Sequence, residues 1–252
     1  MSLLAVERIK LFSTRSPWWC IGLVAFISIG FAALIAALTD DLEFVTVGST
    51  QVGYNLAFPV ILVLAILGIT TEYRFSTIRV SFMAVPNRTA VLMAKTTLVA
   101  LVCGVLGEVT AFISYGVAKL IQPDAGLSID TGAEWRYVTG IGLVYAIGAI
   151  IGISIGALVR QTAAAVSIVL VYSLLFESLI GLVPRVGDDI QKYLPFINAN
   201  HYLTQGAGEA GGEGAGFGLD MPWGAWGALA YYVAIAVAFL VAATVIVERR
   251  DA

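Results

Sequence analysis

Two carboxylates, Glu108 and Glu177, stand inside long apolar runs of this sequence, where acidic side chains are unusual. An ionised carboxylate that faces lipid near the middle of a membrane is costly, so Glu108 should face protein or a water-filled path. Two interpretations of Glu108 stay open. Either it lines a translocation route, or its protonated or hydrogen-bonded carboxyl locks helices together. Glu177 either contacts a solute at an outer gate or reaches water among the lipid headgroups.

No catalytic constellation stands out in the sequence. It has no G-x-x-x-x-G-K-[ST], so no P-loop for nucleotide is expected. The single histidine, His201, excludes the paired histidines of intramembrane metalloproteases. We therefore expect no catalytic residue, no metal and no cofactor on this chain.

The elements that must position the two carboxylates are membrane spans. The chain of 252 residues is 59% hydrophobic and only 12% charged, far from the balance of a water-soluble domain. Its apolar stretches mostly have the ~20 residues that cross a hydrocarbon core. There are six of them, residues 17–38, 54–71, 91–121, 137–158, 162–183 and 226–247. The prediction is an all-α integral membrane protein with a single transmembrane domain over residues 1–252.

The connecting segments fall into two electrical groups. The first carries ten Lys or Arg against four acids, in residues 1–16, 72–95, 160 and 248–252. The second carries four Lys or Arg against eleven acids, in residues 39–53, 119–136 and 184–225. Basic loops stay cytoplasmic, so the pattern predicts N-in, C-in topology with acidic loops outside. The net charge of −3 sums two opposed surfaces, and no basic patch with interleaved aromatics predicts a nucleic-acid partner.

Two segments of the basic group are predicted to be helical. Residues 1–16 place Ala5, Val6, Ile9 and Phe12 on one side, as in a helix along the membrane surface, although an ordinary basic anchor fits equally well. In residues 73–85, a stripe of apolar residues along one side of the helix is predicted to pack on the membrane helices. Two further apolar residues lie off this stripe and would suit a groove on a partner protein. The stripe is Phe75, Ile78, Phe82 and Val85, and the uncovered residues are Val80 and Met83. The alternative is a solvated loop whose arginines only set the topology.

The third and fourth spans have distinctive faces. A continuous polar or small side of the third contains Gly104, Glu108 and Tyr115, and Asn87 is placed to cap its beginning after Pro86. In the fourth span, glycines recur every fourth residue at Gly148, Gly152 and Gly156, which favours close helix packing. Cys20 and Cys103 lie in apolar spans, where no disulfide is expected.

Residues 184–225 form the largest outer segment. The spacing of Val186, Ile190, Tyr193 and Ile197 predicts a short helix on the membrane surface, broken at Pro195. The glycine-rich run 206–218 is predicted to be a flexible loop. Trp223 and Trp226 are typical of an aromatic belt at the return to the membrane.

These features together resemble the permease subunit of bacterial type-2 ABC exporters, which move drugs, lipids or polysaccharides. The family's N-terminal elbow helix resembles residues 7–19, ERIKLFSTRSPWW. Its linker between helices two and three resembles residues 68–95, in particular Glu72-Tyr73-Arg74 and the later Pro86, Arg88 and Lys95. The resemblance covers essentially the whole chain through short motifs, although the glycine run departs from the compact return loop of the family.

The resemblance implies partners, sites and a location in the bacterial cell membrane. The partners would be two cytoplasmic ATPase subunits, which hold ATP and Mg, a second copy of this chain or a sister permease, and membrane lipid. The coupling helix would be residues 73–85, with contacts from Arg74, Phe75, Ile78, Arg79, Val80, Phe82 and Met83. Residues 184–203 would form a lid, and helices two and five would line the path for an amphiphilic solute.

The candidate substrate path comprises Glu108, Tyr115, Tyr172, Phe176 and Glu177. The side of the third span that holds Glu108 is less readily placed in the family's path. Two other functions stay open: a secondary or proton-coupled transporter that uses Glu108 and Glu177, and a membrane assembly protein without a transport path. A stoichiometric ATPase after purification would favour the exporter.

Overall fold

The computed structural model describes residues 3–39, 45–78, 83, 87–125, 127–184, 186–205 and 219–250. Within these ranges every regular element is a helix, and six helical stretches are long and apolar enough to cross a membrane. The fold is therefore all-α, as predicted, and has the character of a multi-pass membrane protein. The glycine-rich run 206–218 lies outside the described residues.

The spans are long helices that begin a few residues before the apolar runs in the sequence. They are α2 (Arg15–Leu38), α3 (Gly53–Arg74), α5 (Arg88–Ile121), α6 (Gly132–Val159) and α12 (Ala225–Arg250). The fifth span is not one regular helix, because α7 (Thr162–Val171) passes through the π-helical turn η3 (Tyr172–Phe176) into α8 (Glu177–Ile180). Its helical part ends before residue 183, the predicted boundary.

Capping residues set where two of these helices begin. The Asn87 side chain accepts a hydrogen bond from the Ala90 amide at 3.0 Å, so the predicted cap of α5 is confirmed. Thr131 and Glu134 form a reciprocal capping box that starts α6. With 34 residues, α5 is about 51 Å long and exceeds the thickness of a hydrocarbon core.

The central helices of the bundle are α3 and α6. Most of their apolar residues are buried, whereas α2, α7 and α12 bury only a small part of theirs. A Cβ built on Gly148, Gly152 or Gly156 of α6 would lie 2.6–2.9 Å from a side chain of α3. The three predicted packing glycines thus lie where α3 approaches most closely, at Phe58, Ala65 and Ile69.

We expect Gly152→Val to lower the free energy of unfolding by about 1–3 kcal/mol, because the added methyl groups overpack a contact with the α3 backbone. The Cβ of such a variant would lie 3.1 Å from the Leu62 carbonyl oxygen, and that backbone atom cannot rotate away. Thermal unfolding in detergent measures the change. Gly116→Val is the control, since nothing lies within 4 Å of a Cβ at Gly116. Equal losses in both variants would contradict this contact.

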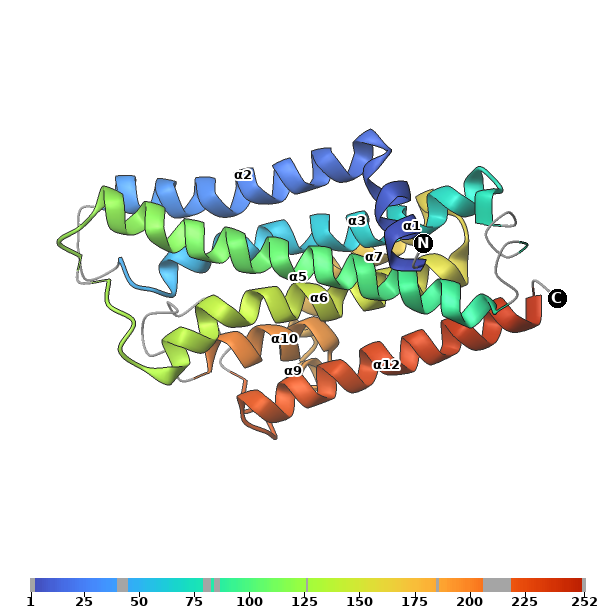
Figure 1. The fold of residues 1–252 in the computed structure, drawn as a ribbon. Coiled ribbons are helices and arrows are strands. Elements are labelled where there is room, and N and C mark those ends of the chain that lie inside the picture. The colour runs from blue at the N-terminus through green and yellow to red at the C-terminus, as the bar shows by residue number, and fades with distance from the viewer. Residues whose placement is uncertain are drawn as a thin grey trace.

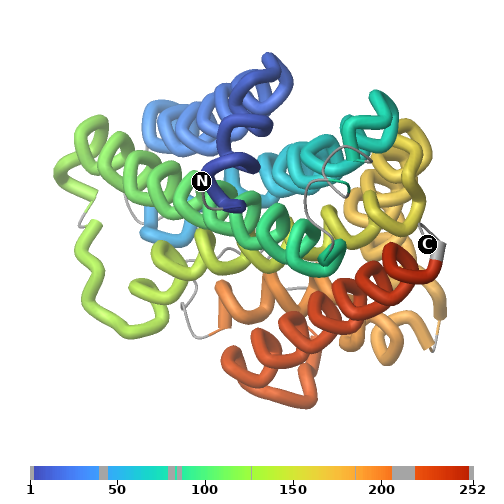
Figure 2. The backbone as a smooth tube through the Cα atoms, turned by 45° about the vertical axis from the view of Figure 1, so that its right-hand side comes forward, coloured from blue at the N-terminus to red at the C-terminus, as the bar shows by residue number. Residues whose placement is uncertain are grey.

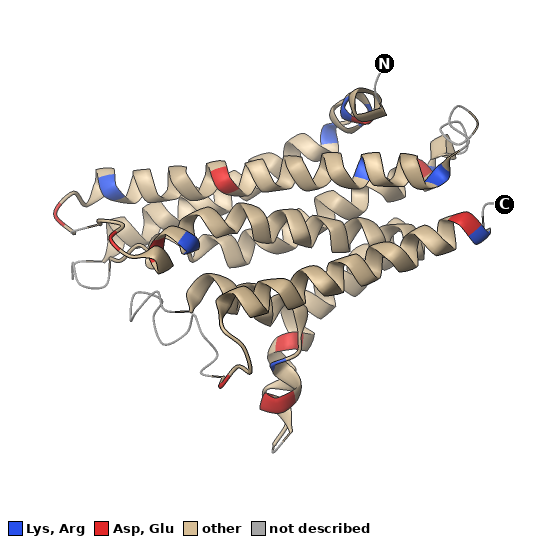
Figure 3. Cartoon of the chain, turned by 60° about the horizontal axis from the view of Figure 1, so that its bottom comes forward, with Lys and Arg blue, Asp and Glu red and all other residues tan. Residues whose placement is uncertain are grey.

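Charge separates the two ends of the bundle. Both chain termini lie at the same end (Figure 1), and charged residues gather towards the helix ends (Figure 3). We call the end with both termini the basic end; it holds Arg74, Arg88, Lys95, Arg160 and Arg249. The opposite end, the acidic end, holds Asp124, Asp130, Glu134, Asp188 and Asp189.

At the basic end, the short helix α1 (Leu3–Phe12) lies across the bundle against α5 and α2 (Figure 2). Only Ser13 and Thr14 separate it from α2. The side of α1 that packs on the protein carries Glu7 and Leu11, while Val6 and Ile9 are exposed. Val6 and Ile9 of the apolar side noted in the sequence therefore face away from the protein, as suits a helix that rests on a membrane, whereas Phe12 of that side packs against the core.

The acidic end follows the prediction of a helix on the membrane surface in part, since Val186, Ile190 and Tyr193 are exposed. The chain does break at Pro195, between α9 (Gly187–Gln191) and α10 (Pro195–Thr204). However, α10 packs against α12 and α6, and Ile197, Asn198 and Leu203 are buried. The reason is polar anchoring: the Asn198 side chain donates to the Lys192 and Leu194 carbonyls at 2.8 Å and accepts from the Trp223 indole at 2.7 Å.

Candidate functional site

Four charged side chains from three helices meet at the basic end. Lys95 of α5 donates to Glu7 of α1 and, at 2.8 Å, to Glu72 of α3. Lys10 of α1 lies 2.7 Å from the second Glu7 oxygen and 3.4 Å from Glu72. We call Glu7, Lys10, Glu72 and Lys95 the charge cluster. It ties the surface helix α1 to two membrane helices.

The charge cluster is largely hidden from water. The side chains of Lys95, Glu7 and Glu72 are 6%, 3% and 9% exposed, while Lys10 is 32% exposed at the rim. Burial by itself would raise the pKa of Glu7, but the Lys95 charge and hydrogen bonds from both lysines outweigh burial and hold it below its ordinary value. Burial would lower the pKa of Lys10, yet its bonds with Glu7 and the Glu72 charge raise it. Both groups are therefore stabilised in their charged forms.

Sequence reasoning placed Glu72 and Lys95 in a basic loop and Glu7 on a surface helix, and did not join them. A signal was present: Lys95 lies two turns inside a helix capped at Asn87, where a lone cation requires a partner. The partner could not be identified, because Glu7 is 88 residues away in the chain.

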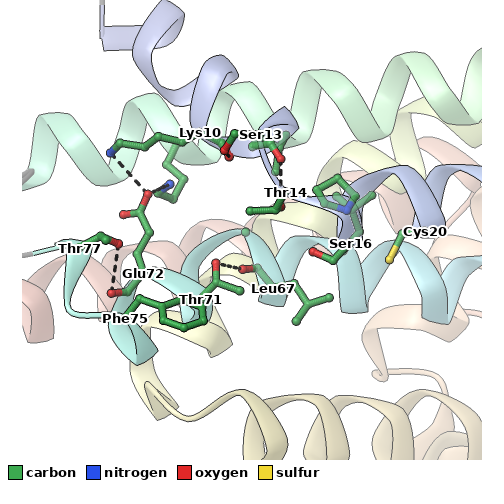
Figure 4. A pocket seen from close by; sticks show the side chains of 15 residues that line it. Lys10, Ser13, Thr14, Ser16, Cys20, Leu67, Thr71, Glu72, Phe75 and Thr77 are labelled. Atoms are coloured by element: carbon green, nitrogen blue, oxygen red, sulfur yellow. Dashed lines mark hydrogen bonds and ion pairs between the residues drawn. The ribbon is translucent and has the colours of Figure 1, made fainter.

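A cavity of about 610 Å³ adjoins the charge cluster between α1, α2 and α3 (Figure 4). One part of its wall is apolar, with Leu64, Leu67 and Pro17, and another part is polar. The polar part carries Lys10, Ser13, Thr14, Ser16, Thr71 and Glu72. The second oxygen of Glu72, Oε2, is buried and accepts no hydrogen bond from the described residues.

The predicted coupling helix does not run unbroken from residue 73. Tyr73 and Arg74 belong to α3, and the chain turns at Phe75 and Ser76, where Ser76 has a φ of 58°. Phe75, expected to pack on the membrane helices, is 68% exposed, so that prediction is wrong. Its ring lies 5.5 Å from the Arg74 guanidinium and lines the cavity between α1, α2 and α3 (Figure 4).

Two other residues of the predicted coupling segment lie as the pattern indicated. Ile78 is buried, and Met83 is 77% exposed. The remaining coupling residues, Arg79, Val80 and Phe82, lie outside the described residues, as does Val85 of the stripe.

Glu108 lies at the contact between α5 and α6. A Cβ on Gly142 of α6 would be 2.6 Å from Glu108 Oε2 and 2.6 Å from the Gly104 carbonyl oxygen. Only glycine lets the carboxyl approach the neighbouring backbone so closely. This geometry favours the interpretation in which Glu108 joins two helices. Tyr115, also proposed for the path, donates to the Leu127 carbonyl at 2.6 Å and fastens a connecting segment at the acidic end.

Glu177 has a structural task at the other end of the bundle. Its carboxylate accepts the amides of Phe196 and Ile197 at 3.1 and 2.9 Å, which are free donors of the first turn of α10. The side chain is 3% exposed. The carboxylate therefore caps a buried helix.

Tyr172 and Phe176 stack with ring centroids 5.3 Å apart in the π-helical turn, and Tyr172 meets Phe196 of α10 at 5.8 Å. Such turns are frequent at functional sites. A second cavity, of about 240 Å³, lies between α3, the fifth span and α10, and we call it the outer cavity. Its wall includes Tyr54, Phe58, Ser173, Glu177, Phe196 and Asn200.

Of the candidate path residues, Glu177 lines the outer cavity, while Tyr172 and Phe176 are its neighbours on the fifth span and do not line it. The structure does not bring Glu108 and Tyr115 of α5 into the wall of the outer cavity. Among the described residues, no group of three His, Cys, Asp or Glu side chains is placed to hold a metal ion. Cys20 and Cys103 are free thiols.

No known protein family matches this chain, and a search of curated proteins finds no match.

Proposed function

We propose that this chain is the membrane-spanning permease subunit of an ATP-driven exporter for an amphiphilic solute. In this proposal the basic end faces the cytoplasm of a bacterial cell, two ATPase subunits dock there, and a second permease completes the path. The proposal rests on the resemblance of the elbow and of the linker between α3 and α5, together with the charge cluster beside that linker.

The charge cluster is the observation that carries the proposal. Its salt bridges join α1, α3 and α5, and the linker between α3 and α5 leaves the bundle directly beyond Glu72. A force on the linker would therefore act on three helices as one body rather than bend a single helix end. Transmission of motion from a motor to a membrane path needs such a junction.

The outer cavity supports a solute path along helices two and five. Aromatic rings and a few hydroxyl and amide groups form its wall, which suits an amphiphile more than an ion. The proton-coupled alternative gains no support from Glu108 or Glu177, since the first lies against Gly142 and the second caps α10.

Purification in mild detergent from the native host tests the proposal. We expect an ABC-type ATPase to co-purify in a 1:1 ratio with this chain, and ATP hydrolysis in liposomes to rise with an amphiphilic solute. A homogeneous preparation without any ATPase, still able to move solute down a proton gradient, would contradict the exporter and favour a secondary transporter.

Within that complex, Met83→Asp is expected to weaken docking of the ATPase about tenfold, which corresponds to about 1.4 kcal/mol. Met83 is exposed at the basic end, and a carboxylate in its place would lose water on entering an apolar groove. Binding of the purified ATPase to permease liposomes measures the effect. Arg249→Asp is the control, because it places an acid at the same end but on α12. Equal binding by wild type and Met83→Asp would count against docking at the linker.

A further inference from the structure

The cavity beside the charge cluster has the build of an amphiphile site. Its volume of about 610 Å³ lies within the about 300–1,000 Å³ of small-molecule sites. Leu64, Leu67 and Cys20 form the apolar part of the wall, deeper along α2 and α3. The hydroxyls of Ser13, Thr14 and Ser16 lie where α1 turns into α2 (Figure 4). The deeper part of the wall is thus apolar, and the end at α1 holds the polar groups together with Leu11 and Phe75.

The position of the cavity matches the boundary between lipid headgroups and acyl chains. One wall is the surface helix α1, and the others are the ends of two membrane spans at Arg15 and Arg74. Trp18 and Trp19, the residues that follow in α2, are 59% and 78% exposed, as side chains of an interfacial belt are. An amphiphile in this cavity would keep the depth that it has in the bilayer.

The charges in the wall favour a headgroup of both signs. Lys10 and Lys95 stand beside Glu72, whose Oε2 is buried and accepts no hydrogen bond within the part of the chain that the structure describes. A buried carboxylate oxygen without a donor is costly, and an ammonium group would satisfy it once the Glu72 carboxyl turns towards the cavity. A phosphate would find Lys10 and the Ser16 hydroxyl, and the hydroxyls of Ser13 and Thr14 could donate to it in place of the Lys10 and Leu11 carbonyls. A headgroup with only a negative charge would leave the Glu72 oxygen unsatisfied.

We infer that this cavity binds one phospholipid with a primary-amine headgroup, such as phosphatidylethanolamine, from the leaflet at the basic end. Its ammonium lies towards Glu72, its phosphate lies towards Lys10 and the hydroxyls, and the upper acyl chains lie against Leu64 and Leu67. The inference needs only that the chain sits in a bilayer, and it does not depend on the exporter proposal.

Native mass spectrometry of the delipidated protein with added lipid tests the site. We expect wild type to retain one phosphatidylethanolamine, and Leu67→Trp to lose it because the indole fills the cavity. Leu101→Trp, an exchange at a 59% exposed leucine of α5, is the matched control and should retain the lipid. Retention of the same lipid by Leu67→Trp would overturn the site.

Cys20 gives a second measurement that needs no variant. This thiol lines the cavity and is half-buried, whereas Cys103 is fully buried, so alkylation of native protein reports Cys20. Phosphatidylethanolamine at about ten times its Kd leaves about a tenth of the sites free, so alkylation should slow about tenfold. Phosphatidylglycerol and free phosphoethanolamine at the same concentration should protect much less.

Each control lipid decides a different part of the inference. Equal protection by phosphatidylglycerol would overturn the role of the ammonium group. Equal protection by free phosphoethanolamine would overturn the role of the acyl chains. An unchanged alkylation rate with phosphatidylethanolamine would overturn the site as a whole.

Discussion

Lys95→Met is expected to lower the free energy of unfolding by about 3–5 kcal/mol, because it leaves two buried carboxylates without their shared cation. Lys95 bridges Glu7 and Glu72, and all three side chains are at most 9% exposed. Lys10, at the rim of the cluster, cannot compensate for both acids. Chemical unfolding in mixed micelles measures the loss. Faster hydrogen exchange in α1 should accompany it, since Lys95 fastens that helix to α5.

Two further variants separate this effect from a general sensitivity to lysine loss. Lys192→Met removes a salt bridge to Asp189, whose side chain is 74% exposed, and should cost about 1 kcal/mol or less. Adding Glu7→Gln and Glu72→Gln to Lys95→Met should restore part of the lost stability, because no buried charge then lacks a partner. If Lys95→Met lowers the free energy of unfolding no more than Lys192→Met does, this interpretation is wrong.

Glu177→Leu should release the first turn of α10. Its carboxylate is the acceptor for the amides of Phe196 and Ile197, and each buried donor left without an acceptor costs about 1–3 kcal/mol. We expect faster hydrogen exchange in residues 195–204 and a lower midpoint of thermal unfolding. Glu177→Gln keeps one carbonyl acceptor and should lose less.

Asp189→Leu is the matched control for this prediction, because it removes an exposed acid from α9, the short helix that precedes α10. It should leave exchange in α10 unchanged. Wild-type exchange in the Glu177→Leu variant would show that the Asn198 hydrogen bonds alone hold α10 in place. A loss of proton-driven transport without any change in α10 would instead support the secondary-transporter alternative for Glu177.

The linker between α3 and α5 shows how far a helical pattern can be trusted. The stripe through Phe75 and Ile78 assumed one helix from residue 73, but the left-handed conformation at Ser76 ends α3 and separates the two residues. Periodicity records which residues are apolar, and it does not record where the chain turns. For that reason Ile78 is buried, whereas Phe75 is exposed.

Of the candidate sites, the sequence could name the acids but not their partners. Glu108 and Glu177 are visible as charges in apolar runs, because the cost of such a charge depends on the residue itself. Gly142 beside Glu108, and the α10 amides beside Glu177, come from other elements. Without that pairing, a cap and a transport residue look the same.

The sequence by itself determined the six apolar helices and the separation of basic and acidic ends. Hydropathy and charge act residue by residue, so the transfer of each segment between water and lipid can be judged without the rest of the chain. Only the tertiary structure decided that Glu7 meets Lys95, that α10 enters the bundle, and that a cavity opens beside α1. These features depend on contacts between residues far apart in the chain, where each partner lowers the cost of burying the other.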